Sequence, residues 1–219
     1  MKGTVRYLNV HAEGEDQLRT RLLQGLAESI HRRGYLDTTI SDIVRLAHTS
    51  KRSFYDRYDT KLDCFLDLFR TATDELIVMI RAAVDPDADW RDQVTAAVAV
   101  YLRSIENRPA ITLSWVRELP TIGRAVRPAQ RRSFDELAGL LTEITANPGF
   151  RRAGLDPVSP VAATILLGGL RELAAQSVED GIALEGLVEQ AAAAAMALIE
   201  DASPSPIEPP ETPAGTPAR

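Results

Sequence analysis

The side chains best suited to chemistry stand close together in one short segment, residues 50–58. This segment reads Ser-Lys-Arg-Ser-Phe-Tyr-Asp-Arg-Tyr. Phe54 and Tyr58 are four residues apart, so on a helix they share one face and are expected to pack inward. The outer face then carries basic and hydroxyl groups, which can donate to guanine edges and to phosphates, and a tyrosine, which can pack against a thymine methyl group. The segment is therefore typical of a helix that reads DNA.

A short helix before this segment is predicted to brace it. Thr39-x-x-Asp42 is a variant of the capping box, with Asp in place of the usual Glu or Gln, and it predicts a helix start at Thr39. The apolar face of this helix consists of Ile40, Ile43, Val44 and Ala47. Residues 47–49 interrupt the pattern, and Ser50 can cap the next helix. Two short helices joined by such a turn form a helix-turn-helix unit, whose second helix enters the DNA major groove.

An amphipathic helix over residues 16–33 is predicted to complete this domain. Its apolar stripe recurs at four-residue spacing and consists of Leu18, Leu22, Leu26 and Ile30. Gly34 is placed to end the helix, since glycine accepts a left-handed conformation. Gly25 lies inside the helix and costs stability, so a closely packed neighbour is expected there. Residues 16–61 are therefore predicted to form a three-helix DNA-binding domain.

Helical patterns continue over the rest of the chain, without a convincing strand pattern or internal repeat. Thr60-x-x-Asp63 begins a fourth helix, and Asp85-Pro86-Asp87 breaks the chain after it. The further helices are predicted at residues 88–107, 110–119, 122–146 (with a kink or a late start near Pro128), 160–180 and 183–201. The fold is expected to be all-α with about nine helices.

The predicted domain limits follow from these patterns. Residues 62–202 are expected to form one helical ligand-binding and dimerisation domain. Residues 1–15 show no sustained period and are expected to be a flexible arm. Residues 203–219 are rich in Pro, Ser and Thr and are expected to be a disordered tail.

Charge and composition narrow the class of protein. Residues 1–60 carry 10 Lys/Arg and 8 Asp/Glu, a net charge of +2, whereas the remainder carries 15 and 23, a net charge of −8. A mildly basic head on an acidic body fits a protein that touches DNA at one end only. A single cysteine, Cys64, excludes an intramolecular disulfide and favours the cytoplasm. Residues 1–10 lack a signal-peptide pattern, and the longest apolar run, residues 158–170, is too short for a membrane span.

Motifs typical of enzymes and metal sites are lacking in the sequence. It has no Gly-rich phosphate loop, no Gly-x-Ser-x-Gly and no His-Glu-x-x-His. His11, His31 and His48 are scattered, and one cysteine cannot form a zinc cluster. The sequence therefore predicts neither catalysis nor a metal or cofactor.

The N-terminal part resembles the signature of the TetR family of transcription regulators. The residues that carry the resemblance over positions 18–70 are Arg21-Leu22-Leu23, Arg33-Gly34-Tyr35, Thr38-Thr39-Ile40 with Ile43, and Ser50-Lys51-x-x-Phe54-Tyr55-x-x-Tyr58-x-x-Lys61. The resemblance assigns to the DNA face Thr39, Ser50, Lys51, Arg52, Ser53, Tyr55, Arg57 and Lys61. Tyr55 and Lys61 occupy the positions most typical of phosphate contact in the family.

Two residues of the motif need comment. The family usually has Gly in the turn where this chain has His48. We expect a positive φ angle there, which His tolerates better than most non-glycine residues. Asp56 on the second helix either accepts from a cytosine amine or forms part of a solvated helix surface.

The resemblance also implies a dimeric, ligand-responsive C-terminal domain. Dimer contacts are expected from the last two helices, at Leu166, Gly169, Leu170, Leu173, Leu187, Ala191, Ala195 and Leu198. A pocket for a small apolar or aromatic molecule is expected to be lined by Phe69, Met79, Trp90, Tyr101, Trp115, Phe134 and Leu141. Taken singly, each of these residues is more readily explained as ordinary core. Arg103, Arg117 and Glu118 could bind a polar group or lie on a solvated helix face.

Taken together, these implications describe a dimeric repressor that leaves a palindromic DNA operator when a small molecule binds. No membrane partner is expected. The alternative is a helical dimeric module that binds a ligand or a protein without sequence-specific DNA binding.

Overall fold

The computed structural model describes residues 15–202, and all regular structure in that range is helical. The predicted N-terminal arm, apart from Glu15, and the predicted C-terminal tail lie outside the described residues. The N-terminal helices are α1 (Glu15–Arg33), α2 (Ile40–Leu46), α3 (Lys51–Tyr55) and α4 (Lys61–Ala83). The others are α5 (Trp90–Glu106), α6 (Pro109–Leu113), α7 (Arg127–Thr145), α8 (Pro148–Arg152), α9 (Pro160–Asp180) and α10 (Val188–Ala202).

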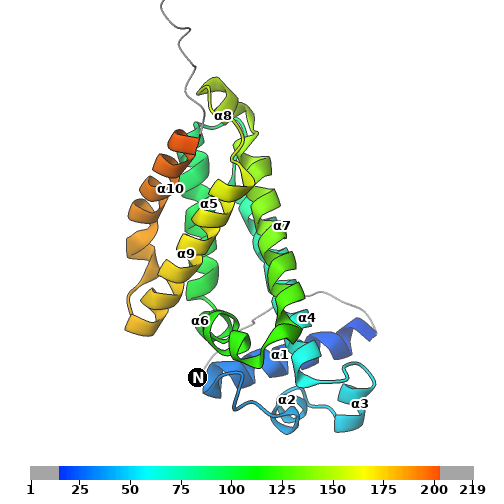
Figure 1. Cartoon of the computed structure of the whole chain (residues 1–219). Coiled ribbons are helices and arrows are strands. Elements are labelled where there is room, and N and C mark those ends of the chain that lie inside the picture. The colour runs from blue at the N-terminus through cyan, green and yellow to red at the C-terminus, as the bar shows by residue number, and fades with distance from the viewer. Residues whose placement is uncertain (1–14, 203–219) are drawn as a thin grey trace, which may run out of the picture.

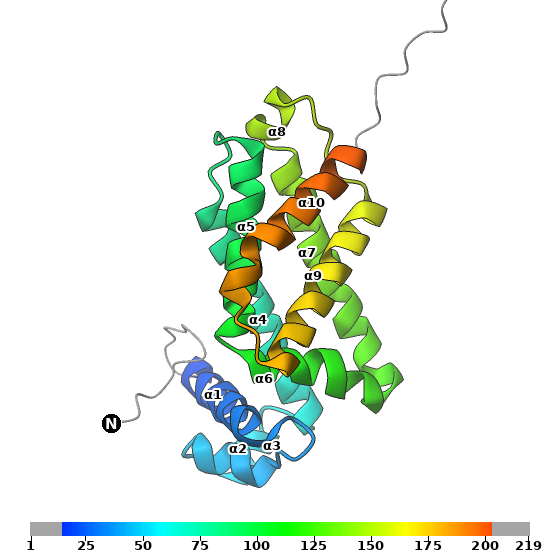
Figure 2. The same cartoon turned by 90° about the vertical axis from the view of Figure 1, so that its left-hand side faces the viewer.

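The molecule is elongated, with α1, α2 and α3 gathered at one end and α8 at the other (Figure 1). Between these ends, α4, α5, α7, α9 and α10 form a bundle (Figure 2). The all-α architecture with an N-terminal helix-turn-helix domain confirms the prediction from the sequence.

Two apolar cores hold these parts together. The N-terminal core is built on the stripe of α1, where Leu22, Leu26 and Ile30 are fully buried. Burial of each such side chain contributes about 1.5–3 kcal/mol. Helix α4 belongs to both cores, because Phe65 lies in the N-terminal core and Ile80 in the C-terminal one. Helix α4 is therefore a rigid connection between the two domains.

The segment after α6 differs from the single helix predicted over residues 110–119. Helix α6 ends at Leu113 and is followed by a π-helical turn (Ser114–Glu118) and 3₁₀ turns at Leu119–Ile122 and Arg124–Val126. Pro120 accounts for the change, since its ring clashes with the carbonyl four residues earlier and it has no N–H to donate. The π turn places three consecutive side chains, Trp115 to Arg117, differently from a regular helix.

Proline also explains where α7 and α8 begin. Helix α7 begins at Arg127 with Pro128 in its first turn, in agreement with the predicted late start. The sequence patterns predicted no helix between residues 146 and 160. Pro148 in fact begins the short helix α8, because proline is favoured in the first turn of a helix.

Candidate DNA interface and ligand cavity

Side-chain caps position the helix-turn-helix unit, as predicted. The Thr39 hydroxyl accepts from the Asp42 amide at 3.2 Å, and the Asp42 carboxylate accepts from the Thr39 amide at 3.2 Å. Hydrogen bonds from Thr39 hold the pKa of Asp42 below its ordinary value. The Ser50 hydroxyl accepts from the Ser53 amide at 3.1 Å and so begins α3. These caps fix where α2 and α3 start.

The crossing of α1 and α2 depends on Gly25. A Cβ atom at this position would lie 2.7 Å from the Ile43 carbonyl oxygen and 2.9 Å from the Ala47 nitrogen. The expected close neighbour of Gly25 is therefore the backbone of α2. His48 has a φ angle of 51°, as predicted for the turn, so its conformation is one that glycine usually supplies.

A half-buried polar clamp ties the segment that follows α3 to α1 and α4. The Tyr58 hydroxyl donates to the Asp67 carboxylate at 2.6 Å, and two Arg19 nitrogens donate to the same carboxylate at 2.7 Å each. Burial raises the pKa of Asp67, but the hydrogen bonds from Arg19 and Tyr58 outweigh burial and lower it overall. A charged, bidentate pair of this kind holds α3 rigidly to the rest of the domain.

The outer face of α3 is open to a partner. Phe54 is fully buried, whereas the Tyr55 side chain is 54% exposed. The other exposed predicted contacts are Ser50, Lys51, Arg52 and Arg57. Within residues 15–202, no carboxylate forms an ion pair with any of these three basic side chains. Ser53 is half-buried with its hydroxyl on Ser50, and Thr39 is exposed.

The Lys61 side chain is held by hydrogen bonds within the protein. Its ammonium donates to the carbonyls of Tyr35 at 2.7 Å, Leu36 at 3.2 Å and Thr38 at 2.6 Å. These bonds use all three of its hydrogens, and burial lowers the pKa of Lys61. In this structure Lys61 therefore fastens the loop between α1 and α2, and its phosphate contact stays a prediction.

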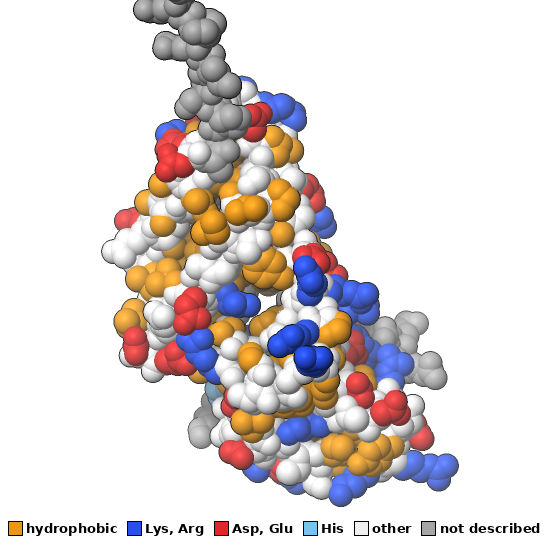
Figure 3. Space-filling model, viewed as in Figure 1, with side chains coloured by type: hydrophobic (Ala, Val, Ile, Leu, Met, Phe, Trp, Pro, Cys, Tyr) orange, Lys and Arg blue, Asp and Glu red, His pale blue; other side chains and the backbone are white. Residues whose placement is uncertain are grey.

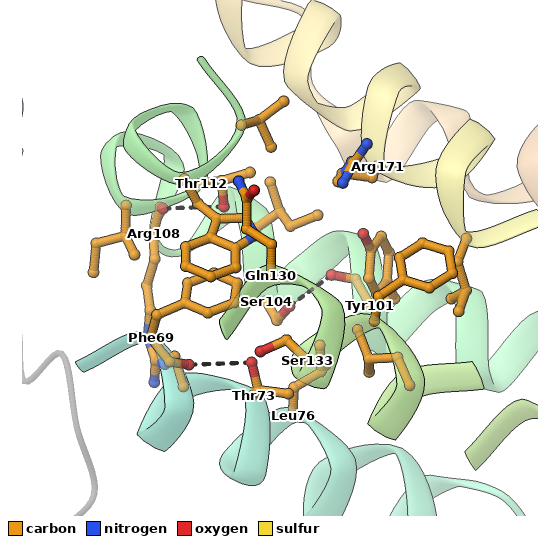
Figure 4. A pocket seen from close by; sticks show the side chains of 18 residues that line it. Phe69, Thr73, Leu76, Tyr101, Ser104, Arg108, Thr112, Gln130, Ser133 and Arg171 are labelled. Atoms are coloured by element: carbon orange, nitrogen blue, oxygen red, sulfur yellow. Dashed lines mark hydrogen bonds between the residues drawn. The ribbon is translucent and has the colours of Figure 1, made fainter. Parts of the chain in front are cut away.

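A mainly apolar cavity lies between α4, α5, α6, α7 and α9. Four predicted pocket residues line it: Phe69, Tyr101, Trp115 and Phe134. Figure 4 labels Phe69 and Tyr101 among the lining side chains. Polar groups from Thr73, Ser104, Gln130, Ser133 and Arg171 also border it. The prediction missed Gln130 and Ser133, although they share helical spacing with Phe134 and Leu137 on α7.

A second apolar cavity lies next to the first. Both are lined by Tyr101, Leu137 and Leu167, and the predicted Leu141 lines the second. Burial raises the pKa of Tyr101 to about 12, although Arg171 acts in the opposite direction. Its phenol is therefore a neutral hydrogen-bonding group at the junction of the two cavities.

Two predicted pocket residues lie elsewhere. Met79 is 41% exposed on the outer face of α4, because the inward face of that turn is taken by Leu76 and Ile80. Trp90 is buried at the start of α5, where its ring packs against Phe150 at 5.8 Å between centroids. Neither lines the cavities described above.

The π turn after α6 joins the cavity wall to the DNA-binding domain. The Trp115 ring stacks on Phe69, with centroids 3.4 Å apart. Three residues later, the Glu118 carboxylate accepts from the backbone amides of Tyr35 at 2.8 Å and Leu36 at 3.3 Å. Between them, the Arg117 guanidinium binds Glu172 and Glu179 of α9, at 2.8 and 2.7 Å. Glu118 and Arg117 are thus structural ties and are not free to bind a polar group of a ligand.

The predicted dimer residues are only partly available on the surface. Leu170, Ala191 and Ala195 are buried within the chain's own core, so their assignment to the dimer face is wrong. The remaining predicted residues are exposed or half-buried: Leu166, Gly169, Leu173, Leu187 and Leu198. Two apolar side chains that the prediction missed, Val161 and Ile165, are 69% and 57% exposed on α9. With Gly169 they recur every four residues and so share one face.

The described range offers no cluster of His, Cys, Asp and Glu suited to a metal ion. It also has no helix with the length and apolarity that a membrane span needs.

Comparison with known proteins agrees with this geometry. Residues 22–68 match the family described as bacterial regulatory proteins, tetR family. The HTH-type transcriptional activator FasR of Mycolicibacterium smegmatis is 29% identical over 92 residues, which span 42% of this chain and 42% of FasR.

Solved structures show the same fold. The fatty acid degradation regulator FadR of Bacillus halodurans has a TM-score of 0.69 and 18% identity over 84% of this chain and 98% of its own. FadR of Bacillus subtilis in complex with stearoyl-CoA has a TM-score of 0.66 and 16% identity, over 82% and 96%. A TetR-family regulator of Syntrophomonas wolfei has a TM-score of 0.72 and 16% identity, over 85% and 97%. Residues 22–68 thus match the N-terminal domain of the tetR family, and the described residues share the fold of these solved regulators.

Proposed function

We propose that this chain is a cytoplasmic, dimeric repressor that binds a palindromic operator and releases it when a long acyl ligand enters the cavity. The observation that carries the DNA-binding part is the outer face of α3. Lys51, Arg52, Tyr55 and Arg57 are exposed there, while the clamp on Asp67 holds the helix from behind. A rigid helix with free basic and aromatic side chains has the donors needed for base edges and phosphates.

The shape of the cavities supports an elongated ligand. Their lining follows α7 from Gln130 to Thr145. At 1.5 Å per residue, this stretch of helix is about 22 Å long. The inner cavity is bordered almost wholly by aliphatic and aromatic side chains. FadR of Bacillus subtilis, which has the same fold, binds stearoyl-CoA. A long acyl chain therefore fits the ligand proposed here.

Two structural ties can carry a change from the cavity to the DNA face. Helix α4 brings Phe69 to the cavity and Phe65 to the N-terminal core. The π turn brings Trp115 to the cavity and Glu118 to the loop before α2. A ligand that separates Phe69 from Trp115 would move both ties. It shifts the population of conformations only if it binds them with different affinities.

The dimer proposed here uses the exposed face of α9. Val161, Ile165 and Gly169 form an apolar strip without cover from the chain's own core. In such a dimer the two α3 helices would meet successive major grooves, about 34–36 Å apart. Ile165→Arg should convert the dimer to a monomer in sedimentation velocity, whereas Val78→Arg, an exposed apolar site on α4, should not.

The main test is a selection from a random duplex library. Wild type should enrich a palindrome, and Tyr55→Ala combined with Arg57→Ala should not. Arg81→Ala, an exposed arginine on α4 that pairs with Glu143 at 2.6 Å, is the control and should enrich the same palindrome. Absence of enrichment by wild type at low salt would instead favour a helical module that binds a ligand or a protein.

A second arm tests the direction of regulation. Stearoyl-CoA added to the selected duplex complex should release the protein, and a reporter behind that palindrome should be repressed until the ligand is supplied. Activation of the reporter by the protein would overturn the repressor assignment but not the DNA-binding one.

A further inference from the structure

Four arginines stand together at the start of α7, at positions 124, 127, 131 and 132. All four are exposed. Among the described residues, no carboxylate forms an ion pair with any of them, although Asp135 and Glu136 follow directly in sequence. Ten other arginines of the described range do form such pairs. In a chain of net charge −6, this arginine cluster is an unneutralised positive patch.

The arginine cluster lies beside the cavity mouth. The same turns of α7 carry Gln130, Ser133 and Phe134, which line the cavity. Figure 3 shows Lys and Arg side chains gathered over the lower part of α7, next to a hollow between α7 and α9. Arg171 enters the lining from α9, on the side opposite Gln130, and lies near Tyr101 (Figure 4). Arg171 thus borders the cavity itself, and the arginine cluster lies on the turns of α7 that also carry lining residues.

Arg132 extends the positive edge to the other side of α7. It lines an open groove between α4 and α7, together with Arg70 and the outer sides of Phe69 and Trp115. Asp67 also borders this groove, but its carboxylate is occupied by Arg19 and Tyr58. The stacked pair of Phe69 and Trp115 therefore forms a common wall between the groove and the cavity.

The combination of an apolar channel with an arginine-rich rim selects a particular chemistry. Guanidinium groups bind phosphate oxygens in a bidentate manner and keep their charge at any physiological pH. We propose that Arg127, Arg131 and Arg171 form a subsite for the phosphate-bearing head of a ligand whose acyl chain fills the cavities. This proposal rests on the ligand-responsive function proposed above and adds the charged end of the ligand. It predicts an acyl thioester of coenzyme A in preference to a free fatty acid.

The test compares two ligands with the same acyl chain, stearoyl-CoA and stearate, by isothermal titration calorimetry on the full chain. Wild type should bind stearoyl-CoA at least about tenfold more tightly than stearate. Arg127→Ala combined with Arg131→Ala should weaken stearoyl-CoA binding about tenfold and change stearate binding less than about twofold. Raising the NaCl concentration should weaken only the stearoyl-CoA complex of wild type.

Matched variants separate the subsite from general charge effects. Arg151→Ala combined with Arg152→Ala removes two exposed arginines from α8, at the other end of the molecule, and should change neither affinity. Arg127→Lys combined with Arg131→Lys keeps the charge and should retain most of the stearoyl-CoA affinity. The thermal unfolding midpoint of each variant should match wild type, since the substituted side chains are exposed.

The proposal is overturned if the alanine pair weakens both ligands equally, weakens neither, or if wild type fails to bind stearoyl-CoA. It is also overturned if the alanine pair loses operator binding but keeps its ligand affinity, because the arginine cluster would then contact DNA. The DNA selection on the same preparations reports separately on the regulator. If the palindrome is still enriched, only the proposed head-group subsite is refuted and the proposed DNA-binding function stands.

Discussion

The ring of Trp115 lies flat on the ring of Phe69, with centroids 3.4 Å apart and planes 8° from parallel. Phe69 comes from α4 and Trp115 from the π turn, so the stack joins the two structural ties that run to the DNA-binding domain. A ligand that fills the proposed cavity would contact this stack, because both rings line it. The two rings are therefore where occupancy of the cavity should first be detected.

The stack predicts a specific optical signal. The chain has two tryptophans, of which Trp115 lines the cavity and Trp90 does not. Stearoyl-CoA should change the tryptophan emission of wild type and of Trp90→Phe, but not of Trp115→Phe, because only Trp115 loses its stacked neighbour. A titration followed by fluorescence checks this. An unchanged response in Trp115→Phe would place the ligand elsewhere.

For Glu118→Ala we predict weaker coupling between ligand binding and operator binding, with operator binding itself retained. Its carboxylate accepts from the Tyr35 and Leu36 amides, and Glu118→Ala removes both bonds. We expect the operator affinity of the free protein to change less than about threefold. The ligand-induced loss of operator affinity should fall about tenfold, which corresponds to about 1.4 kcal/mol of coupling.

The measurement is the ratio of operator dissociation constants with and without stearoyl-CoA, by fluorescence anisotropy. Glu185→Ala, an exposed acidic residue in the turn before α10, is the control and should keep the wild-type ratio. A wild-type ratio in Glu118→Ala would show that α4 alone carries the coupling.

The packing around Gly25 predicts that alanine destabilises the protein at this position, although alanine favours helix formation. Alanine is the better helix former by about 1 kcal/mol. At Gly25, however, its Cβ would lie 2.7 Å from a backbone oxygen of α2, which cannot move like a flexible side chain. Gly25→Ala should therefore lower the free energy of unfolding by about 1–3 kcal/mol.

Gly139 on α7 provides the matched control, because a Cβ there would meet nothing within 4 Å. Gly139→Ala should raise the free energy of unfolding by about 0.5–1 kcal/mol. Urea titrations followed by circular dichroism measure both variants. Equal shifts of the same sign would contradict the packing explanation for Gly25.

Asp67 predicts how stability depends on pH. Burial raises its pKa, yet the hydrogen bonds from Arg19 and Tyr58 hold the pKa below the ordinary value of 3.8. A carboxyl group with a depressed folded-state pKa stabilises the fold above its unfolded-state pKa. This contribution is lost as the pH falls through the folded-state value. Asp67→Asn should therefore lower the free energy of unfolding at pH 7 by about 2 kcal/mol.

The difference between wild type and Asp67→Asn should stay constant from pH 7 to about pH 5 and shrink below about pH 4. Urea titrations at pH 7, 5 and 3 test this. Asp74→Asn on the same helix, whose exposed side chain lies 3.8 Å from Arg70, should cost less than about 0.5 kcal/mol throughout. If the difference in free energy of unfolding between wild type and Asp67→Asn persists at pH 3, Asp67 stabilises the fold by its shape and not by its charge.

Local rules of helix formation were enough to predict the DNA-binding domain. The capping boxes at Thr39 and Thr60, the cap at Ser50 and the positive φ of His48 all follow from neighbours within a few residues. The four-residue stripe of α1 marked its buried face for the same reason. Such features depend on short-range geometry, which the order of residues specifies directly.

Lys61 and the dimer face show where local rules fail. The motif placed Lys61 at a helix start, but only the folded loop between α1 and α2 brings three carbonyls around its ammonium. An alanine-rich helix such as α10 is apolar on most sides, so periodicity could not separate its inner face from an outer one. Packing against α5 decided that Ala191 and Ala195 face inward.

The sequence by itself determined the helical class of this protein and its helix-turn-helix unit, because caps, turns and helical spacing are local properties. Only the tertiary structure decided how the cavity is shaped, which residues border it and how it connects to α2. Those features join residues far apart in the chain, such as Phe69 with Trp115 and Glu118 with Tyr35. Their meeting depends on the π turn at Ser114–Glu118 and on the packing of α4, α7 and α9, which no short stretch of sequence contains.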